Sequence, residues 1–294
     1  MSDPRVLMDD LVIGESPRWH DGRLWFCHWG PDRIVAVTEE GASEHPYPDD
    51  EVRAHSIDWL PDGRQLIVPK DQARLLRREP DGSLVDHADL SALPGGLNEL
   101  VADGRGNVYV NGLAFDFLAF LEERKHDEDP TVPWRERPGF EPGFLALVTP
   151  DGAVRRVAEG IEFPNGMVVT PDGRTLVVSE SFAGRLTAFD IAEDGSLTNR
   201  RGWADGLAPD GICLDAEGAI WTSTGGDVCV RVSEGGRILD RVEVAGSPFA
   251  CMLGGRDGRT LFALTASWNP DDPFGARTGR VLALNAPAPH TGHP

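Results

Sequence analysis

Hydrophobic residues are grouped along the chain in short runs, and a polar turn that contains glycine precedes six of these runs. The runs are rich in Val, Ile, Leu and aromatic residues and are bounded by turn-forming residues, which is typical of β-strands. They cover residues 24–29, 65–69, 107–112, 175–181, 219–224 and 260–267. We therefore expect a protein built mainly of strands.

The glycine before each run recurs at a nearly regular interval. These glycines are Gly22, Gly63, Gly106, Gly173, Gly218 and Gly258, which gives steps of 41, 43, 67, 45 and 40 residues. The step of 67 shrinks to about 40 once the insertion in that repeat is removed. A second strand-like run follows each first one, at 33–37, 74–78, 144–148, 185–189, 228–232 and 280–284. A period of about 40 residues with four short strands per repeat is typical of β-propellers.

The sequence therefore predicts an all-β fold, a six-bladed β-propeller of four-stranded antiparallel blades, with residues 1–294 forming a single domain. The segment before the first repeat is too short to form a blade of its own. We expect Arg5 to Ile13 to add a strand to the last blade and so to close the ring.

The repeat allows equivalent positions of the six blades to be compared. Seven or eight residues before the glycines stand Glu15, Ser56, Asn98, Asn165, Asp210 and Ala250. Each position lies just before the apolar start of the strand that lines the channel, so we expect all six to surround the channel mouth on one face. Carboxylate and amide oxygens are the ligands that Ca²⁺, Mg²⁺ and Mn²⁺ prefer. The pattern predicts one divalent metal ion at this mouth, and the absence of histidine from the six positions disfavours Zn²⁺.

A structural role for the same residues is the alternative. Asp, Asn and Ser at strand entrances often form turns by bonding their own backbone, and Asn165-Gly166 and Asp210-Gly211 resemble such turns. The shared position in the repeat, and the presence of Glu15, which is not a turn former, favour metal binding.

Four segments of the chain carry a resemblance to a known family. Glu15-Ser16-Pro17-Arg18-Trp19, Asn98, Pro164-Asn165-Gly166 and the run from Pro209 to Gly218 resemble the senescence marker protein (regucalcin) and gluconolactonase family. The resemblance implies that Glu15, Asn165 and Asp210 ligate the metal, with Ca²⁺ favoured over Mg²⁺, Mn²⁺ and Zn²⁺. It also implies that Asn98 lies beside the metal, and that the reaction is hydrolysis of a sugar lactone or a similar cyclic ester.

Chemical reasoning adds one role within this set. A carboxylate beside a metal ion can hold the ion and also accept a proton from the attacking water, so Asp210 is the candidate general base.

The chain departs from the family pattern in blade three. Sugar lactonases of this type have Arg two residues before Asn98 and Asp directly after it, whereas this chain has Gly96 and Glu99 at those positions. A charge that binds the substrate is therefore missing, which indicates a more apolar or differently charged substrate. We assign substrate binding to five residues near the predicted mouth: Asn98, Glu99, Ser56, His55 and Lys70. Trp268 lies near the same loops.

Blade three also contains an insertion at about 115–143, between its second and third strands. Phe117, Phe120 and Leu121, set against Glu122, Glu123, Arg124 and Lys125, give a short amphipathic, helix-like pattern, and a proline-rich stretch follows. The first strand of the blade leaves the face that carries the predicted metal site, and the second strand returns to it. The loop between the second and third strands is therefore expected on that face. We predict a lid that excludes water from the site, with a packing or dimerisation loop as the alternative.

Charge and composition restrict the partners. The net charge of −20, from 48 acidic and 28 basic residues, would repel nucleic acid and anionic membranes, so we expect a small-molecule substrate. The chain shows neither a leader pattern nor a long apolar stretch, which predicts a cytoplasmic protein. The four cysteines are far apart, and we expect reduced, buried thiols. Glu180 is interpreted as a solvated charge at the rim.

Two other classes of function remain open from the sequence. One is an esterase-like or strictosidine-synthase-like enzyme on the same fold, and the strictosidine synthase type works without the ion. The other is a non-catalytic propeller that binds calcium or a partner protein. The oligomeric state is not indicated.

Overall fold

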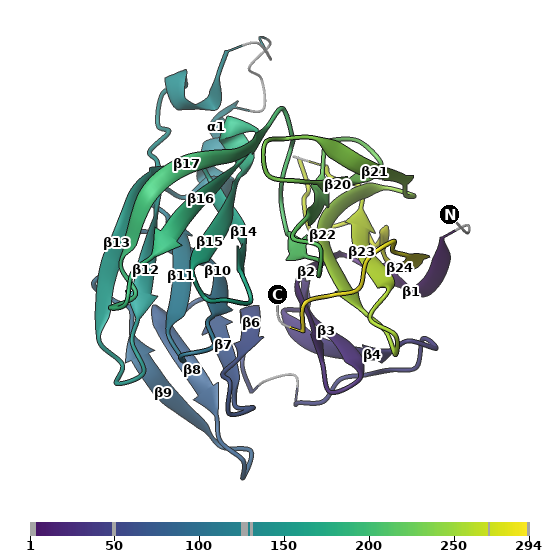
Figure 1. Cartoon of the computed structure of the whole chain (residues 1–294), viewed down its shortest axis with the longest axis horizontal. Coiled ribbons are helices and arrows are strands. Elements are labelled where there is room, and N and C mark those ends of the chain that lie inside the picture. Colours follow the sequence, from purple (N-terminus) through teal and green to yellow (C-terminus); the bar gives the residue numbers. More distant parts are fainter. Residues whose placement is uncertain (1–3, 49–50, 125–128, 130–131, 270, 293–294) are drawn as a thin grey trace.

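The computed structural model describes residues 4–48, 51–124, 129, 132–269 and 271–292. Within these residues the strands form six four-stranded antiparallel sheets, which are arranged around a common centre (Figure 1). The innermost strand of each sheet contacts the innermost strands of both neighbouring sheets, so that the ring is continuous. The predicted six-bladed β-propeller is confirmed.

In blades one to five the strands follow one another in the chain from the centre outward, and in blade six β22, β23 and β24 do so while β1 is the outermost strand. Blades one to three are β2 (Ile13–His20), β3 (Arg23–Trp29), β4 (Arg33–Thr38), β5 (Ser43–Glu44); β6 (Ala54–Trp59), β7 (Gln65–Pro69), β8 (Arg74–Arg78), β9 (Leu84–Asp89); and β10 (Gly96–Ala102), β11 (Val108–Leu113), β12 (Gly143–Val148), β13 (Val154–Ile161). Blades four to six are β14 (Pro164–Val169), β15 (Thr175–Glu180), β16 (Arg185–Ile191), β17 (Leu197–Asp205); β18 (Cys213–Leu214), β19 (Ile220–Ser223), β20 (Val228–Val232), β21 (Ile238–Glu243); and β22 (Ser247–Gly254), β23 (Thr260–Ala266), β24 (Gly279–Asn285), β1 (Arg5–Leu11).

The ring is closed by the N-terminal strand, as expected. β1 pairs antiparallel with β24, with Val6 opposite Leu282, and so supplies the outer strand of blade six. The closing strand is shorter than predicted, because it ends at Leu11 and Ile13 already begins β2 of blade one.

The hydrophobic core lies between neighbouring sheets. The middle strands of each blade are covered on both faces, and Leu66, Ile67 and Val68 of β7 are all fully buried. This explains why the second strand of each repeat reads as a continuous apolar run rather than an alternating one. The largest apolar cluster joins blades one, five and six and includes Phe26, Trp221 and Phe262.

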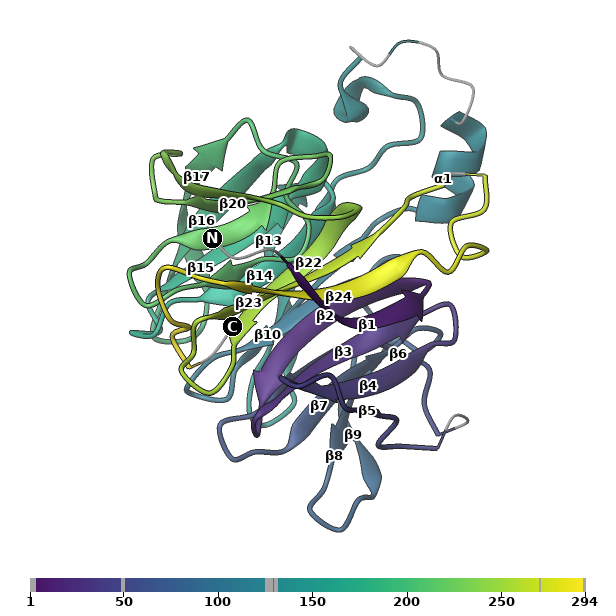
Figure 2. The same cartoon turned by 90° about the vertical axis from the view of Figure 1, so that its right-hand side faces the viewer.

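The insertion of blade three lies between β11 and β12, where the sequence predicted it. It contains a helix, α1 (Phe117–Arg124), and a short 3-10 turn, η1 (Trp134–Glu136). Figure 2 shows α1 and the segment after it standing beyond the sheets at one end of the propeller. Residues 125–128 and 130–131, which belong to the predicted helix-like and proline-rich stretches, lie outside the described residues.

The four cysteines are free and buried, as expected. They are Cys27, Cys213, Cys229 and Cys251. In the part of the chain that the structure describes, no helix combines the length and apolar character needed to cross a membrane.

The interpretation of Glu180 as a solvated charge is wrong. Its side chain is completely buried and lies 3.0 Å from the Arg185 guanidinium and 2.9 Å from that of Arg200. Burial alone would raise the pKa of Glu180, but hydrogen bonds from Arg185 and Thr187 and the charge of Arg200 together hold it below the usual 4.5. Glu180 therefore joins β15 to β16 and β17 as a structural ion pair.

Replacing Glu180 with Gln should destabilise the protein, because two guanidinium groups lose their counter-charge. We expect a loss of up to about 3 kcal/mol at pH 7, at the low end for buried pairs because both arginines are about one-third exposed. The lowered pKa means that this stability is present above pH 4.5 and is lost as the pH falls through the folded-state pKa. Urea unfolding at several pH values measures both effects.

The matched control is Glu159→Gln, which removes an exposed carboxylate paired with Arg156 at 3.0 Å. That change should cost less than about 0.5 kcal/mol. Equal losses in the two variants, or a loss in Glu180→Gln that does not shrink at low pH, would contradict a structural role for Glu180.

Candidate active site

The six equivalent positions predicted to surround the channel lie in or next to the innermost strands. In five blades a β-bulge interrupts the inner strand at this point, so that the local side chains are redirected. The irregularities fall between Glu15 and Arg18, Ala54 and Ser56, Leu97 and Leu100, Pro164 and Met167, and Pro248 and Ala250. In the fifth blade Asp210 precedes the two-residue strand β18. The sequence repeat thus reflects a repeated backbone distortion as well as a repeated strand.

The glycines that follow Asn165 and Asp210 permit close approach of neighbouring blades. A Cβ atom on Gly166 would lie 2.6 Å from the backbone nitrogen of Ile212, and one on Gly211 would lie 2.5 Å from the Cβ of Ala250. Neither glycine has a positive φ, and Asn165 is part of β14. Asn165-Gly166 is therefore not a turn, whereas Gly211 lies at a bend before β18, and both glycines allow close packing between blades four, five and six.

Hydrogen bonds between blades fix the backbone around both residues. Gly166 N donates to the carbonyl oxygen of Asp210 at 3.2 Å, and the Ser179 hydroxyl donates to the same oxygen at 2.8 Å. Asn111 of β11 donates to the carbonyl oxygen of Asn165 at 2.7 Å and accepts from Glu99 N at 3.0 Å. Asn111 therefore couples blade three to blade four at the site.

Three carboxylates influence one another at the centre of this face. Burial raises the pKa of Glu15 well above its usual range, and the charges of Asp210 and Glu99 add to the effect. Burial and the charge of Glu99 raise the pKa of Asp210 to about 8, and burial raises that of Glu99 to about 7. Asp210 Oδ1 is buried without a hydrogen-bond partner among the described residues. In the absence of a cation these carboxyl groups therefore retain protons near neutral pH, because their described neighbours offset the negative charge only in part.

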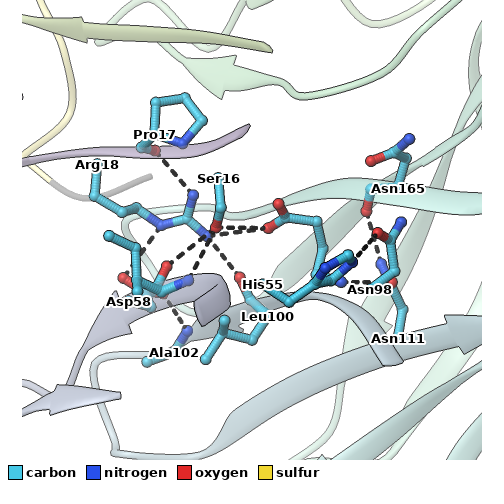
Figure 3. A network of polar contacts seen from close by, with 12 residues as sticks. Ser16, Pro17, Arg18, His55, Asp58, Asn98, Leu100, Ala102, Asn111 and Asn165 are labelled. Carbon is cyan, nitrogen blue, oxygen red and sulfur yellow. Dashed lines mark hydrogen bonds and ion pairs between the residues drawn. The ribbon is translucent and has the colours of Figure 1, made fainter. Parts of the chain in front are cut away.

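Arg18 supplies the positive charge next to this cluster. Its guanidinium lies 3.3 Å from Asp58 and 3.6 Å from Glu99, and it donates to the carbonyl oxygen of Leu100 at 2.6 Å. The Ser16 hydroxyl donates to Glu99 Oε2 at 3.2 Å and accepts from Ile57 N at 3.1 Å. Figure 3 shows this network beside His55, Asn98, Asn111 and Asn165.

A cavity of about 890 Å³ opens above these residues. Of the eight predicted site residues, six line it: Glu15, His55, Lys70, Asn98, Asn165 and Asp210. Ser56 and Glu99 are buried and are not among its described lining residues. Phe115, Phe117 and Trp134 of the insertion line the cavity as well. The size is in the range of pockets that bury small ligands.

Lys70 and His55 reach the cavity but are engaged with protein groups. The Lys70 ammonium lies 2.9 Å from Asp32, which also pairs with Arg53. The His55 ring stacks on Trp29 with centroids 4.2 Å apart, and its Nε2 lies 3.4 Å from Asn98 Oδ1. Burial lowers the pKa of His55 to about 4, so its imidazole is neutral at pH 7.

The donor set fits a hard cation better than a soft one. No group of three or more His, Cys, Asp or Glu side chains in the described residues has a metal-binding arrangement. The predicted set differs from such a group, because it contains two carboxylates and one amide, Glu15, Asp210 and Asn165. The buried Asp210 Oδ1 without a partner and the mutual repulsion of the carboxylates are conditions that a bound Ca²⁺ or Mg²⁺ would relieve.

Sequence reasoning missed Arg18 and Asn111 as site residues. Arg18 stands in a segment that carried the family resemblance, but its partners Asp58 and Glu99 are distant in the sequence. The sequence gives one indication of the role of Asn111, namely a polar residue near the end of an apolar strand run. In the structure its side chain is completely buried. A buried amide in such a place requires hydrogen-bond partners.

The fold and the buried acidic cavity define a six-bladed β-propeller with a candidate small-molecule site at one end of its channel. The chain belongs to the SMP-30/Gluconolactonase/LRE-like family, whose model matches residues 13–267.

Individual relatives extend over most of the chain. Pentonolactonase XacC of Haloferax volcanii is 26% identical, and the alignment covers 100% of this chain and 97% of that protein. Regucalcin of Oryctolagus cuniculus is 28% identical, with 89% and 85% covered. Among solved structures, a luciferin-regenerating enzyme superposes with a TM-score of 0.78 at 18% identity and covers 99% of this chain and 98% of its own. At this level of identity the superposition shows that the two proteins share a fold.

Replacing Asp210 with Asn should stabilise the protein in EDTA. Because the folded-state pKa of Asp210 is raised from 3.8 to about 8, the folded protein loses stability as the pH rises between these values. We expect the variant to unfold with a free energy more than about 1 kcal/mol higher than the wild type at pH 9, and with a smaller gain at pH 5. Chemical denaturation at both pH values measures the difference.

The control is Asp9→Asn, which neutralises an exposed aspartate of the outer strand β1 that is not among the described residues lining the cavity. It should change the free energy of unfolding by less than about 0.5 kcal/mol at either pH. A destabilised Asp210→Asn at pH 9 would show that the buried carboxylate is already well compensated.

Proposed function

We propose that the protein is a divalent-metal-dependent hydrolase that opens a lactone, either a sugar lactone or a related cyclic ester. The observation that carries the proposal is that Glu15, Asn165 and Asp210 line one cavity, in which Asp210 Oδ1 is buried without a hydrogen-bond partner among the described residues. Membership of the family and the alignment with a pentonolactonase over the whole chain support it.

Glu15, Asn165 and Asp210 would hold the cation through side-chain oxygens, with Ca²⁺ favoured and Mg²⁺, Mn²⁺ or Zn²⁺ as alternatives. Asn165 Nδ2 lies 3.4 Å from the Ser181 hydroxyl, so its amide oxygen is the atom offered as a ligand. When bound, such an ion would polarise the ester carbonyl and lower the pKa of a nearby water.

Asp210 is the proposed general base. In lactone hydrolysis the water oxygen forms a bond to the carbonyl carbon, the ring ester bond breaks, and the products are a carboxylic acid and an alcohol of the same molecule. Asp210 accepts a proton from the attacking water and returns one to the departing alkoxide. The remaining proton leaves with ionisation of the acid.

The other predicted residues receive different roles. Asn98 and His55 line the cavity and are the proposed polar contacts to the substrate. Lys70 lines the cavity, but its ammonium is paired with Asp32. Glu99 and Ser56 are buried behind the wall, so we propose no direct substrate contact for them; Glu99 instead holds Arg18 and Ser16.

Hydrolysis of a panel of aldonolactones, alkyl lactones and aryl esters tests the proposal. Activity, followed with a pH indicator, should disappear in EDTA and return when one divalent cation is restored. Glu15→Gln and Asp210→Asn should lower kcat/KM at least about 100-fold, because each removes a ligand and Asp210→Asn also removes the base. The exposed variant Asp9→Asn should keep full activity.

Three results would reject it in different ways. Turnover that persists in EDTA and in Glu15→Gln would favour a metal-independent enzyme of the strictosidine synthase type. Turnover of aryl esters without lactones would favour an esterase. Calorimetric binding of Ca²⁺ without turnover of any ester would favour a binding protein.

The insertion is the proposed lid. Its Phe115, Phe117 and Trp134 line the cavity, and Phe120 is buried. Replacing residues 115–141 with a short turn between β11 and β12 should raise KM more than about tenfold while kcat changes less, because the catalytic groups lie on other segments. Unchanged kinetics, or a changed oligomeric state in size-exclusion chromatography, would favour the packing or dimerisation alternative.

A further inference from the structure

Aromatic side chains form most of one wall of the cavity. They come from three separate parts of the chain, namely the insertion, blade four and the loops of blade six. Six of these aromatic lining residues are Phe115, Phe117, Trp134, Phe163, Phe182 and Trp268. All but Phe163 retain partial exposure, so their faces are available to a ligand.

These rings contact one another and form a continuous surface. Phe182 stacks on Phe163 with centroids 4.4 Å apart and on Trp134 at 4.3 Å. Phe117 lies 4.7 Å from Phe163 and 6.5 Å from Trp268, which joins the insertion to the loop of blade six. Mutual packing fixes the ring orientations before a ligand arrives, so little side-chain entropy is lost on binding.

The polar lining residues include Glu15, Asn98, Asn165 and Asp210, and also Asp116 and Ser181, which are chain neighbours of the aromatic residues. Lys70 is the one described lining residue with a permanent positive charge, and Asp32 lies 2.9 Å from its ammonium. Gly96 also lines the cavity and contributes no side chain to it. A polyhydroxylated substrate would therefore place hydroxyl groups against rings that cannot satisfy them, which lowers affinity.

From this geometry we propose that the preferred substrate is a lactone with an apolar aryl substituent rather than a polyhydroxylated sugar lactone. The inference rests on the proposed function. The lactone ring occupies the polar floor at Glu15, Asn165 and Asp210, and the aryl group lies against the wall formed by Phe182, Phe117 and Trp268. Burial of a flat apolar group against these rings supplies the binding free energy.

Three δ-lactones that differ only in their substituents test the proposal. They are an unsubstituted lactone, a phenyl-substituted lactone and a hydroxylated aldonolactone, assayed with the metal-loaded protein. We expect kcat/KM for the phenyl lactone to exceed that for the hydroxylated lactone at least about 100-fold. Equal values, or a preference for the hydroxylated lactone, would overturn the substrate class while the lactonase function stands.

A second measurement does not depend on catalysis. The phenyl-substituted lactam, which resists hydrolysis, should quench the fluorescence of the cavity tryptophans in EDTA, and the hydroxylated lactam should not. If no lactone is turned over but the phenyl lactam still binds, the lactonase proposal fails and the aryl-binding cavity remains. If the phenyl lactam binds no better than the hydroxylated one, the aryl-binding cavity is contradicted.

Variants of Trp268 test whether the aromatic wall is responsible for the preference for the phenyl lactone. Its side chain is 37% exposed at the cavity edge, so the fold should tolerate its removal. Trp268→Ala should lower kcat/KM for the phenyl lactone at least about tenfold more than for the unsubstituted one, through KM, and Trp268→Phe should retain the preference. The control Ile238→Ala, at an exposed position of β21, should leave all three rates unchanged. Equal losses on both lactones in Trp268→Ala would contradict aryl binding.

Discussion

Concentrated negative charge at the centre of the ring is the constraint around which this structure is built. Glu15, Glu99 and Asp210 come from three blades, and burial together with their mutual repulsion raises the pKa of Glu15 and Asp210. Such a cluster tends to expand or to take up protons. It persists because close packing between blades and hydrogen bonds across them leave the backbone no room to relax. Arg18 offsets part of the charge from one side.

The same arrangement connects stability with chemistry. A site that holds its ligating oxygens in place before an ion arrives loses little free energy to reorganisation when the ion binds. The cost appears in the folded protein as buried carboxyl groups with raised pKa values, of which Asp210, whose Oδ1 has no hydrogen-bond partner among the described residues, is the clearest case. Functional sites are commonly places where stability is given up in this way. The buried ion pair of Glu180 has the opposite character, because its charge is matched by Arg185 and Arg200.

The repeat made the fold predictable, since every blade repeats the same strand and turn chemistry. It also brought two carboxylates and two amides to equivalent positions, and comparison along one chain sufficed to find them. What it could not reveal were interactions between distant segments. Arg18 meets Glu99 and Asp58, and Asn111 meets Asn165, only after the ring has formed. Glu180 was misinterpreted for the same reason, because Arg185 and Arg200 cover it from the next two strands of its own blade.

Closure of the ring by β1 has a consequence for biosynthesis. On the ribosome β1 emerges first, but its partner β24 begins only at Gly279 and emerges last. At roughly 5–20 residues per second, the nascent chain carries an unpaired strand edge for a time on the order of tens of seconds. For most of that interval the other strands of blade six have not been synthesised, and β1 is free to pair with a wrong strand. The charged residues Asp9 and Asp10 in β1 oppose such pairing, much as edge strands of mature proteins are protected by charge.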